Sequence, residues 1–277
     1  MFTRRVLLGG AAASAAAAVR SPRAFAQAAE RDREVFYPSD GLKIQAYVSR
    51  PAGRGPFPLV IFNHGSRAGQ ERRSVPFTYM ANLYAAAGYA VLVPERRGYG
   101  ESEGPTFAEA VGADLGPRFL ARMEEEAGDV IAAMHYAGTL PFVDAQRVAV
   151  AGWSFGGIVS LLAAARPEAA FRAVIDQAGG SLTWRRSAAL QTALTAAAKT
   201  IRVPVLFMIA ANDAAPEAVS SLAQARAAAR LPAELKTYPP FTPTANPENI
   251  APGHLIFGLE GVRIWGKDAT AFLAKTL

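Results

Sequence analysis

Short apolar runs alternate with helical segments along the chain, and this alternation constrains the fold more than any other feature. Continuous apolar runs bounded by turn residues are typical of strands that are buried on both faces of a mostly parallel sheet. Strands and helices in alternation predict one doubly wound α/β domain. The runs lie at residues 59–62, 90–93, 148–151, 173–175, 205–209 and, more weakly, 234–238, and the helical candidates at 76–87, 118–137, 156–165, 187–199, 216–230 and 262–275.

Two further strands precede these runs. Residues 34–37 and 43–48 flank the turn signal Ser39-Asp40-Gly41 and predict a hairpin, which completes an eight-stranded sheet flanked by helices. We find no internal repeat and no long linker, so residues 27–277 are expected to form a single domain. Residues 105–120 and 181–199 could each cover part of a cleft, but both are too short for a separate lid domain.

The first 26 residues have the features of an export signal. Arg4 and Arg5 precede an uncharged apolar run, and Ala24-Phe25-Ala26 is a small-x-small cleavage site. The run is shorter than the roughly 20 residues that a bilayer span needs. The paired arginines resemble a bacterial twin-arginine signal, which predicts a periplasmic or secreted protein with no stable membrane anchor. A frayed Ala-rich helix of a cytoplasmic protein is the alternative.

Composition excludes several functional classes. The formal net charge is +6, but four basic residues and no acid fall in the first 26 positions, which leaves 25 − 23 = +2 for the remainder. The remaining basic residues are scattered among acids, so a nucleic-acid partner is not expected. The chain has no cysteine and only three dispersed histidines, so it has no cysteine nucleophile and no recognisable metal-ligand spacing. No cofactor or metal is expected.

The most specific motif is Gly152-Trp153-Ser154-Phe155-Gly156, a G-x-S-x-G sequence between an apolar strand and an apolar helix. In this context the motif predicts a nucleophile elbow, a sharp turn that raises the serine hydroxyl above the edge of the sheet. The glycines make room for close strand–helix packing. The backbone N–H of Phe155 would then face a developing oxyanion. The alternative is an ordinary glycine-rich turn between a strand and a helix.

A serine nucleophile needs a base, and the three histidines narrow the choice. His135 lies within a predicted helix, and His64 precedes Gly65 at the end of an early strand. His254 follows the last predicted strand on a loop from which its ring can reach the edge of the sheet where such sites assemble. We therefore favour His254 as the base, with a capping or solvated loop residue as the alternative.

The acid that orients the base should come from a loop at the same edge. Asp213 follows the predicted strand at 205–209 and can accept a hydrogen bond from the imidazole. It could instead serve an Asx turn or cap the next helix. Asp176, one strand earlier, is the rival acid. We favour Asp213 because it gives the chain order Ser…Asp…His.

These features together resemble the α/β-hydrolase family over residues 33–277. The His64-Gly65 loop and the stretch from Arg97 to Gly104 resemble its dienelactone-hydrolase-like branch, although this chain lacks the cysteine nucleophile of the namesake enzymes. The resemblance implies a serine esterase with a small lid or none. It also implies that the backbone N–H of Ser66 is the second oxyanion donor, with Arg67 as the next candidate.

Other conspicuous residues have weaker interpretations. Trp184 and Arg185 could recognise an aromatic or carboxylate-bearing substrate, or form a surface turn. His64 is a further candidate for substrate contact. Glu95, Arg96 and Arg97 could pair with one another or line the floor of the cleft.

The sequence thus predicts a serine hydrolase that cleaves small-molecule esters through an acyl-enzyme, with Ser154 as nucleophile, His254 as base and Asp213 as orienting acid. A peptidase, thioesterase or acyltransferase would use the same residues. A non-catalytic binding protein on the same scaffold is a different class of alternative. The sequence does not indicate an oligomeric state.

Overall fold

One eight-stranded sheet forms the centre of the computed structural model, which describes residues 30–112 and 116–277. The predicted export signal at residues 1–26 lies outside these ranges. The spatial order of the strands is β1-β2-β4-β3-β5-β6-β7-β8, antiparallel at β1–β2 and β2–β4 and parallel from β4 to β8. The strands are β1 (Glu30–Ser39), β2 (Leu42–Arg50), β3 (Phe57–Asn63), β4 (Ala90–Pro94), β5 (Val143–Trp153), β6 (Ala173–Gln177), β7 (Val205–Ala210) and β8 (Ala233–Tyr238).

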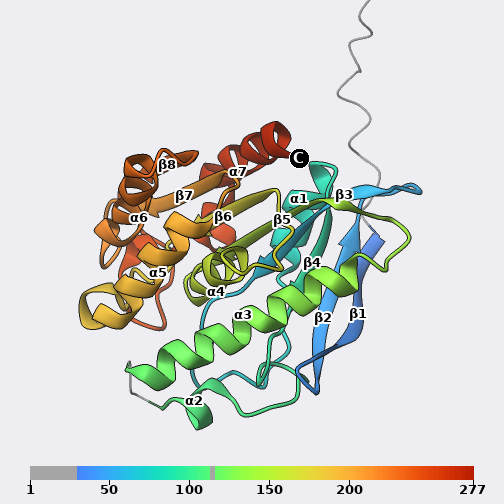
Figure 1. Cartoon of the computed structure of the whole chain (residues 1–277), viewed down its shortest axis with the longest axis horizontal. Helices are drawn as coiled ribbons and strands as arrows, with labels where there is room; N and C mark the ends of the chain where they lie inside the picture. Colours follow the sequence, from blue (N-terminus) through green and yellow to red (C-terminus); the bar gives the residue numbers. More distant parts are fainter. Residues whose placement is uncertain (1–29, 113–115) are drawn as a thin grey trace, which may run out of the picture.

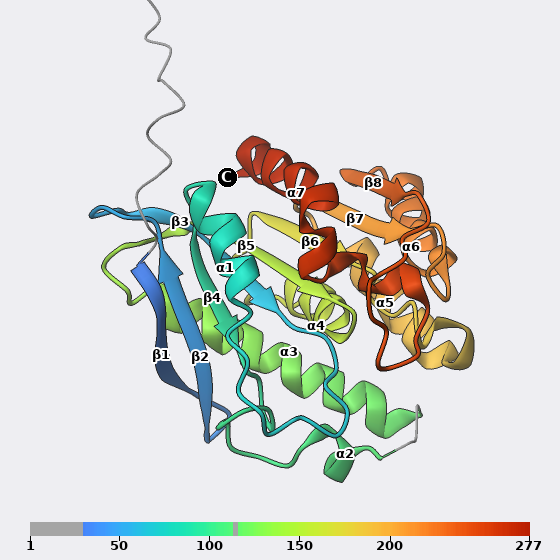
Figure 2. The same cartoon turned by 180° about the vertical axis from the view of Figure 1, so that it is seen from behind.

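Helices cover both faces of this sheet. Helices α1 and α7 lie on one face, and α3, α4 and α5 lie on the other (Figures 1 and 2). Helix α6 packs against β7, β8 and α5. The helices are α1 (Thr78–Ala86), α2 (Phe107–Ala110), α3 (Pro117–Ala137), α4 (Phe155–Ala164), α5 (Ala188–Thr200), α6 (Pro216–Ala228) and α7 (Val262–Thr276).

The predicted α/β class is confirmed, because every residue of β4, β6 and β7 is buried, as continuous apolar runs require. The short helix α2 was not predicted, because four residues are too few to show a helical period. It is nucleated locally by a capping box, in which the Thr106 side chain and the Glu109 side chain each bond the other residue's backbone N–H.

The parallel strands deliver the predicted site residues to one edge of the sheet. Strands β3, β5 and β7 end at Asn63, Trp153 and Ala210, so residues 64–66, residue 154 and residues 211–213 emerge at the same edge, with β6 between β5 and β7. The chain returns to this edge after β8 in the short helical turn η3 (Pro252–Phe257), which carries His254. Ligand sites in open α/β sheets form at this carboxyl-terminal edge.

Three consecutive charged residues after β4 pair with residues of two segments, the β3–α1 loop and helix α3. The carboxylate of Glu95 pairs with Arg67, Arg96 donates to Glu126 at 2.8 Å, and Arg97 pairs with Asp129 at 2.9 Å. They therefore do not pair with one another. The fully buried Glu95 and Arg96 and the nearly buried Arg97 connect the sheet to the β3–α1 loop and to helix α3.

Asp176 in β6 packs closely against the first turn of helix α4. Its Oδ1 accepts a 2.9 Å hydrogen bond from the Gly179 N–H. A Cβ on Gly157, in the first turn of α4, would lie 2.3 Å from that same oxygen. Burial raises the pKa of Asp176 from 3.8 to about 7, because desolvation penalises the carboxylate more than the Gly179 N–H stabilises it.

This shift predicts that the free energy of unfolding falls as the pH rises from about 4 to about 7. In that window the folded protein retains a proton on Asp176 that the unfolded chain has released, a difference on the order of 4 kcal/mol when complete. Asp176→Asn should remove this loss. Its melting temperature should exceed that of the wild type most at pH 8, and the gap should narrow toward pH 4.

The matched control is Asp144→Asn, at a carboxylate whose pKa is lowered by a hydrogen bond from Arg147. This variant should keep the loss of stability of the wild type between pH 4 and pH 8. Thermal unfolding followed by circular dichroism measures both variants. Parallel pH profiles for the wild type and Asp176→Asn would contradict the assignment of the proton to Asp176.

Candidate active site

Ser154 occupies a strained turn between β5 and α4. Its φ is 59° and its ψ is −120°, a conformation that L-residues rarely adopt. The turn brings backbones so close that a Cβ on Gly152 would lie 2.0 Å from the Gly156 oxygen, and one on Gly156 would lie 1.8 Å from the Asn63 oxygen. Both flanking glycines are therefore sterically required. The geometry is that of a nucleophile elbow.

His254 and Asp213 meet beside this turn. His254 Nδ1 lies 2.9 Å from Asp213 Oδ2, and both side chains are almost fully buried. Asp213 Oδ1 also accepts a 2.6 Å hydrogen bond from the Ala214 N–H, so the local turn and the imidazole share one carboxylate. The backbone of His254 is fixed in turn, because its carbonyl accepts a 3.1 Å hydrogen bond from Trp153 Nε1.

Ser154 and His254 line a common cavity of about 210 Å³. His254 Nε2 is buried and makes no hydrogen bond within the described part of the chain. This second ring nitrogen is thus available to accept a proton from the Ser154 hydroxyl, to which it is not hydrogen-bonded in this structure. Contacts between a nucleophile and its base commonly tighten only when substrate binds. Besides these two residues, the lining consists of Gly65, Ser66, Arg67, Phe77, Trp153, Leu182, Glu248, Ile250 and Leu255.

The loop after β3 passes directly over Ser154. A Cβ on Gly65 would lie 3.1 Å from Ser154 Cβ, and Ser66 and Arg67 line the cavity. This loop is anchored because Arg67 pairs with the buried carboxylate of Glu95, which also accepts a 2.6 Å hydrogen bond from the Val75 N–H. Burial raises the pKa of Glu95, and the Arg67 charge opposes that shift. The segment that holds the Ser66 N–H is therefore tied at both ends.

Ser181, which sequence reasoning did not identify, joins the acid and the base. Its Oγ donates to Asp213 Oδ1 at 2.8 Å and lies 3.1 Å from His254 Nδ1. It follows β6 on a loop at the same edge of the sheet as the nucleophile. That position was the available signal, but the sequence offers many serines on loops and nothing that separates this one.

The other candidate residues do not line the cavity. Asp176 does not contact His254, so the structure brings Asp213 and not the rival acid to the base. His64 is fully buried beneath the loop, stacked on Phe77 with ring centroids 5.6 Å apart, and burial lowers its pKa. None of His64, Trp184 and Arg185 lines the cavity. Residues 105–120 and 181–199 were expected to cover part of a cleft. Among their described residues, only Leu182 lines this cavity.

Arg185 and Trp184 have structural partners instead. The guanidinium of Arg185 pairs on the surface with Glu217 at 2.5 Å. Trp184 is buried in the short helical turn η2 (Trp184–Arg186) as part of the hydrophobic core.

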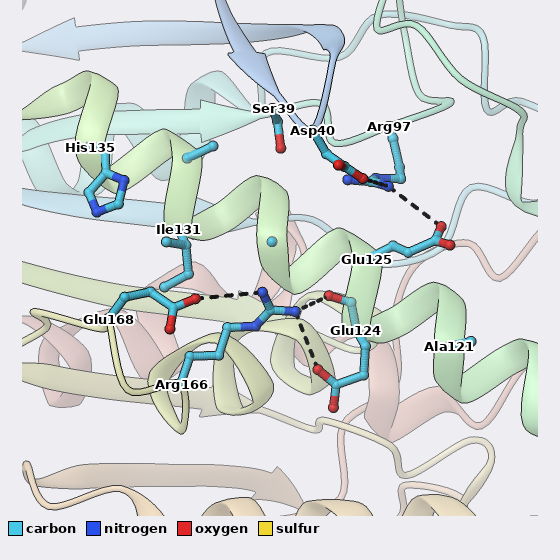
Figure 3. Close-up of a pocket in the computed structure, with 12 residues that line it drawn as sticks. Ser39, Asp40, Arg97, Ala121, Glu124, Glu125, Ile131, His135, Arg166 and Glu168 are labelled. Carbon is cyan, nitrogen blue, oxygen red and sulfur yellow. Dashed lines mark hydrogen bonds and ion pairs between the residues drawn. The ribbon is translucent and has the colours of Figure 1, made fainter.

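A wider groove of about 730 Å³ lies elsewhere, along α3 and beside the β1–β2 hairpin. Its charges pair with each other: Arg97 lies 3.6 Å from Glu125, and Arg166 lies 3.4 Å from Glu124 and 3.8 Å from Glu168 (Figure 3). Because these charges are mutually compensated, the smaller cavity at Ser154 is the better candidate for a reactive centre.

The described ranges, residues 30–112 and 116–277, hold neither a candidate metal site nor a candidate membrane-spanning helix. No group of three or more His, Cys, Asp or Glu side chains there is placed to hold a metal ion. No helix there combines the length and apolar character that crossing a membrane requires.

Solved structures with similar folds are hydrolases. A putative dienelactone hydrolase from Klebsiella pneumoniae superposes with a TM-score of 0.63 at 22% identity, covering 90% of this chain and 100% of that one. An acylaminoacyl peptidase from Pyrococcus horikoshii gives a TM-score of 0.67 at 16% identity, covering 89% of this chain and 42% of that one. These similarities establish the α/β-hydrolase fold.

Parts of the chain are similar in sequence to two curated proteins, and most of it matches one protein family. The quorum-quenching protein AidA of Acinetobacter baumannii is 35% identical over 144 residues, 52% of this chain and 42% of that protein. A probable dipeptidyl-aminopeptidase B of Fusarium vanettenii is 32% identical over 127 residues, 44% of this chain and 13% of that protein. The chain thus spans less than half the length of these curated relatives. The family model described as X-Pro dipeptidyl-peptidase (S15 family) matches residues 40–241, which is most of the chain, so the protein belongs to this family of α/β-hydrolases.

Proposed function

We propose that this hydrolase cleaves carboxylic ester bonds of small molecules through an acyl-enzyme on Ser154. The observation that carries the proposal is the convergence of the elbow serine and an Asp213-bound imidazole on one cavity. An imidazole held at Nδ1 by a carboxylate leaves Nε2 free to act as general base. The small cavity volume of about 210 Å³ favours a compact acyl group.

The first half of the reaction acylates the enzyme. Ser154 Oγ forms a bond to the ester carbonyl carbon as its proton moves to His254 Nε2, and the carbonyl π electrons move to oxygen. The backbone N–H groups of Phe155 and Ser66 stabilise this oxyanion. When the intermediate collapses, the bond to the leaving alcohol breaks and the alcohol takes the proton from His254.

The second half releases the acyl group. Water attacks the acyl-enzyme and transfers a proton to His254 Nε2. Collapse of the second intermediate breaks the bond to Ser154 Oγ, which recovers the proton, and the carboxylic acid departs. Throughout both halves, Asp213 stabilises the transient imidazolium and keeps its ring orientation.

A peptidase activity is the second candidate, supported by the family model, which carries the name of X-Pro dipeptidyl-peptidases. The same residues would then attack an amide carbonyl. A panel of matched ester, thioester, N-acyl peptide and free aminopeptide substrates distinguishes these activities by their kcat/KM values. An alcohol or amine acceptor that outcompetes water would indicate an acyltransferase.

We also propose that the protein is exported to the periplasm or secreted. The support comes from the sequence of residues 1–26, with paired arginines, an apolar run and an Ala-Phe-Ala site. Fractionation of a bacterial host, with mass spectrometry of the mature N-terminus, tests this. A chain that stays intact in the cytoplasm would contradict it.

Ser154→Ala should abolish hydrolysis of p-nitrophenyl acetate, with a loss on the order of 10⁶ in kcat, because the nucleophile of such a unit is indispensable. A fluorophosphonate probe should label the wild type at Ser154, and mass spectrometry would identify the modified peptide. The control is Ser160→Ala. It removes a buried hydroxyl of helix α4 that accepts a 2.9 Å hydrogen bond from the Asn63 side chain in β3. Full activity in a folded Ser154→Ala variant would refute the mechanism.

The charge of the cavity predicts a substrate preference. Arg67 and Glu248 line it with opposite charges, but Glu95 already neutralises Arg67. Within the described residues the Glu248 carboxylate has no ion pair or hydrogen bond. The turn that carries it is fixed, because the Asn246 side chain donates to the Ile250 carbonyl at 2.7 Å and accepts from its N–H at 3.2 Å. The unbalanced charge is therefore negative.

We expect esters with a terminal ammonium on the acyl chain to be hydrolysed faster than equally long esters with a terminal carboxylate. Glu248→Gln should reduce this ratio of kcat/KM values about fivefold at low ionic strength, the scale of one exposed charge interaction. High salt should reduce the wild-type ratio as well. The control is Glu168→Gln, which removes an acid from the other groove. An unchanged ratio in Glu248→Gln would rule out this role for Glu248.

A further inference from the structure

We propose that Ser181 is a positioning residue of the active site, which fixes the tautomer and orientation of His254 by bonding both the base and its acid. This inference rests on the proposed function, since it assigns a role within the same catalytic unit. The three side chains form a closed ring of contacts: Ser181 to Asp213 at 2.8 Å, Asp213 to His254 at 2.9 Å and His254 to Ser181 at 3.1 Å.

The protons in this ring can be assigned from donor and acceptor capacity. An ionised Asp213 carboxylate only accepts, so the single hydroxyl hydrogen of Ser181 goes to Oδ1 and the Nδ1 hydrogen of His254 goes to Oδ2. A lone pair of Ser181 Oγ then faces Nδ1–H as a second acceptor. The Nδ1 hydrogen is then shared between Asp213 Oδ2 and Ser181 Oγ. A neutral imidazole with its hydrogen on Nδ1 has no hydrogen on Nε2, and this is the tautomer that a general base requires.

The loop after β6 is shaped to deliver this hydroxyl. Ala178 has a φ of 56°, a left-handed conformation that is costly for a residue with a Cβ, and Gly180 has a φ of 78°. The turn is held by hydrogen bonds from the Ala178 N–H to the Met208 carbonyl at 2.9 Å and from the Trp184 N–H to the Gly180 carbonyl at 2.8 Å. Ser181 itself is only 2% exposed. Its position is therefore set by the backbone and not by solvent.

A purely structural role would be to satisfy a buried acceptor, but Asp213 does not need Ser181 for that. Its Oδ1 also accepts from the Ala214 N–H, and its Oδ2 accepts from His254. Removing the hydroxyl leaves neither oxygen without a donor, so the expected loss of stability is small. What is lost is the second constraint on the carboxylate and on the ring, which affects catalysis. Ser181 does not line the cavity, so substrate binding should be unaffected.

The test compares Ser181→Ala, Ser181→Thr and Ser187→Ala in the full chain. Ser187 is a similarly buried serine that caps α5 through a 3.3 Å hydrogen bond from the Leu190 N–H, and it does not line the cavity at Ser154. Ser181→Ala should lower kcat for p-nitrophenyl acetate about tenfold with KM nearly unchanged, the scale of one hydrogen bond to a charged group. Ser181→Thr should restore most of the rate, and Ser187→Ala should leave kcat unchanged.

Two further measurements separate this proposal from the proposed function. The rate of fluorophosphonate labelling of Ser154 should fall in Ser181→Ala in step with kcat. The downfield proton NMR resonance of His254 Nδ1–H, identified by its absence in His254→Ala, should shift and exchange faster with water in Ser181→Ala. A merely structural role would not move this resonance.

The outcomes are distinct. If the wild type neither hydrolyses the ester nor reacts with the probe, the proposed function fails. A second outcome is an active wild type together with a correctly folded Ser181→Ala variant that keeps the same kcat, labelling rate and Nδ1–H resonance. That result would refute the role of Ser181 and leave the proposed function standing. A loss in Ser181→Ala that Ser181→Thr does not relieve would also overturn it, because the hydroxyl would not be the cause.

Discussion

The close approach of helix α4 to strands β3 and β5 is the constraint on which the remainder of the site depends. Gly156 packs so tightly on the carbonyl of Asn63 that no side chain fits between them. This contact forces Ser154 into its strained conformation and simultaneously places the β3 loop beside the nucleophile. The proposed nucleophile and both proposed oxyanion donors therefore derive their positions from one backbone contact. The stability of the surrounding sheet maintains the strain.

A second layer of positioning comes from buried charge. Glu95 extends from the end of β4 to the β3–α1 loop, Arg96 and Arg97 extend to helix α3, and each meets an oppositely charged partner. Breaking one such buried pair leaves an uncompensated charge, which costs more than the pair contributes when intact. The arrangement thus penalises any displacement of the loop that carries Ser66. Buried ion pairs here act on geometry more than on net stability.

The alternation of strands and helices, the turn at Ser154 and the meeting of Asp213 with His254 could be predicted, because each depends on local patterns and on the rule that parallel strands end at one edge. The contribution of Ser181 could not, since its role arises from a left-handed turn at Ala178 that no propensity indicates. His64 illustrates the opposite limit. Its position after β3 suggested substrate contact, but packing against Phe77 places the ring beneath the loop. Residue position along a strand predicts the edge, whereas side-chain packing decides which residues face the cavity.

The consecutive residues Asn212 and Asp213 tie down both ends of the segment that brings His254 back to the sheet. Asn212 clamps the backbone of Phe241 at 2.8 and 2.9 Å, and Asp213 holds the imidazole. Gly253 fits against Asn212 so closely that a Cβ there would lie 2.4 Å from Oδ1. The intervening stretch, which includes Glu248, can thus vary in length and chemistry while its two anchor points stay fixed. With this arrangement, substitutions or insertions in one surface segment can change substrate specificity without disturbing the positions of the catalytic residues.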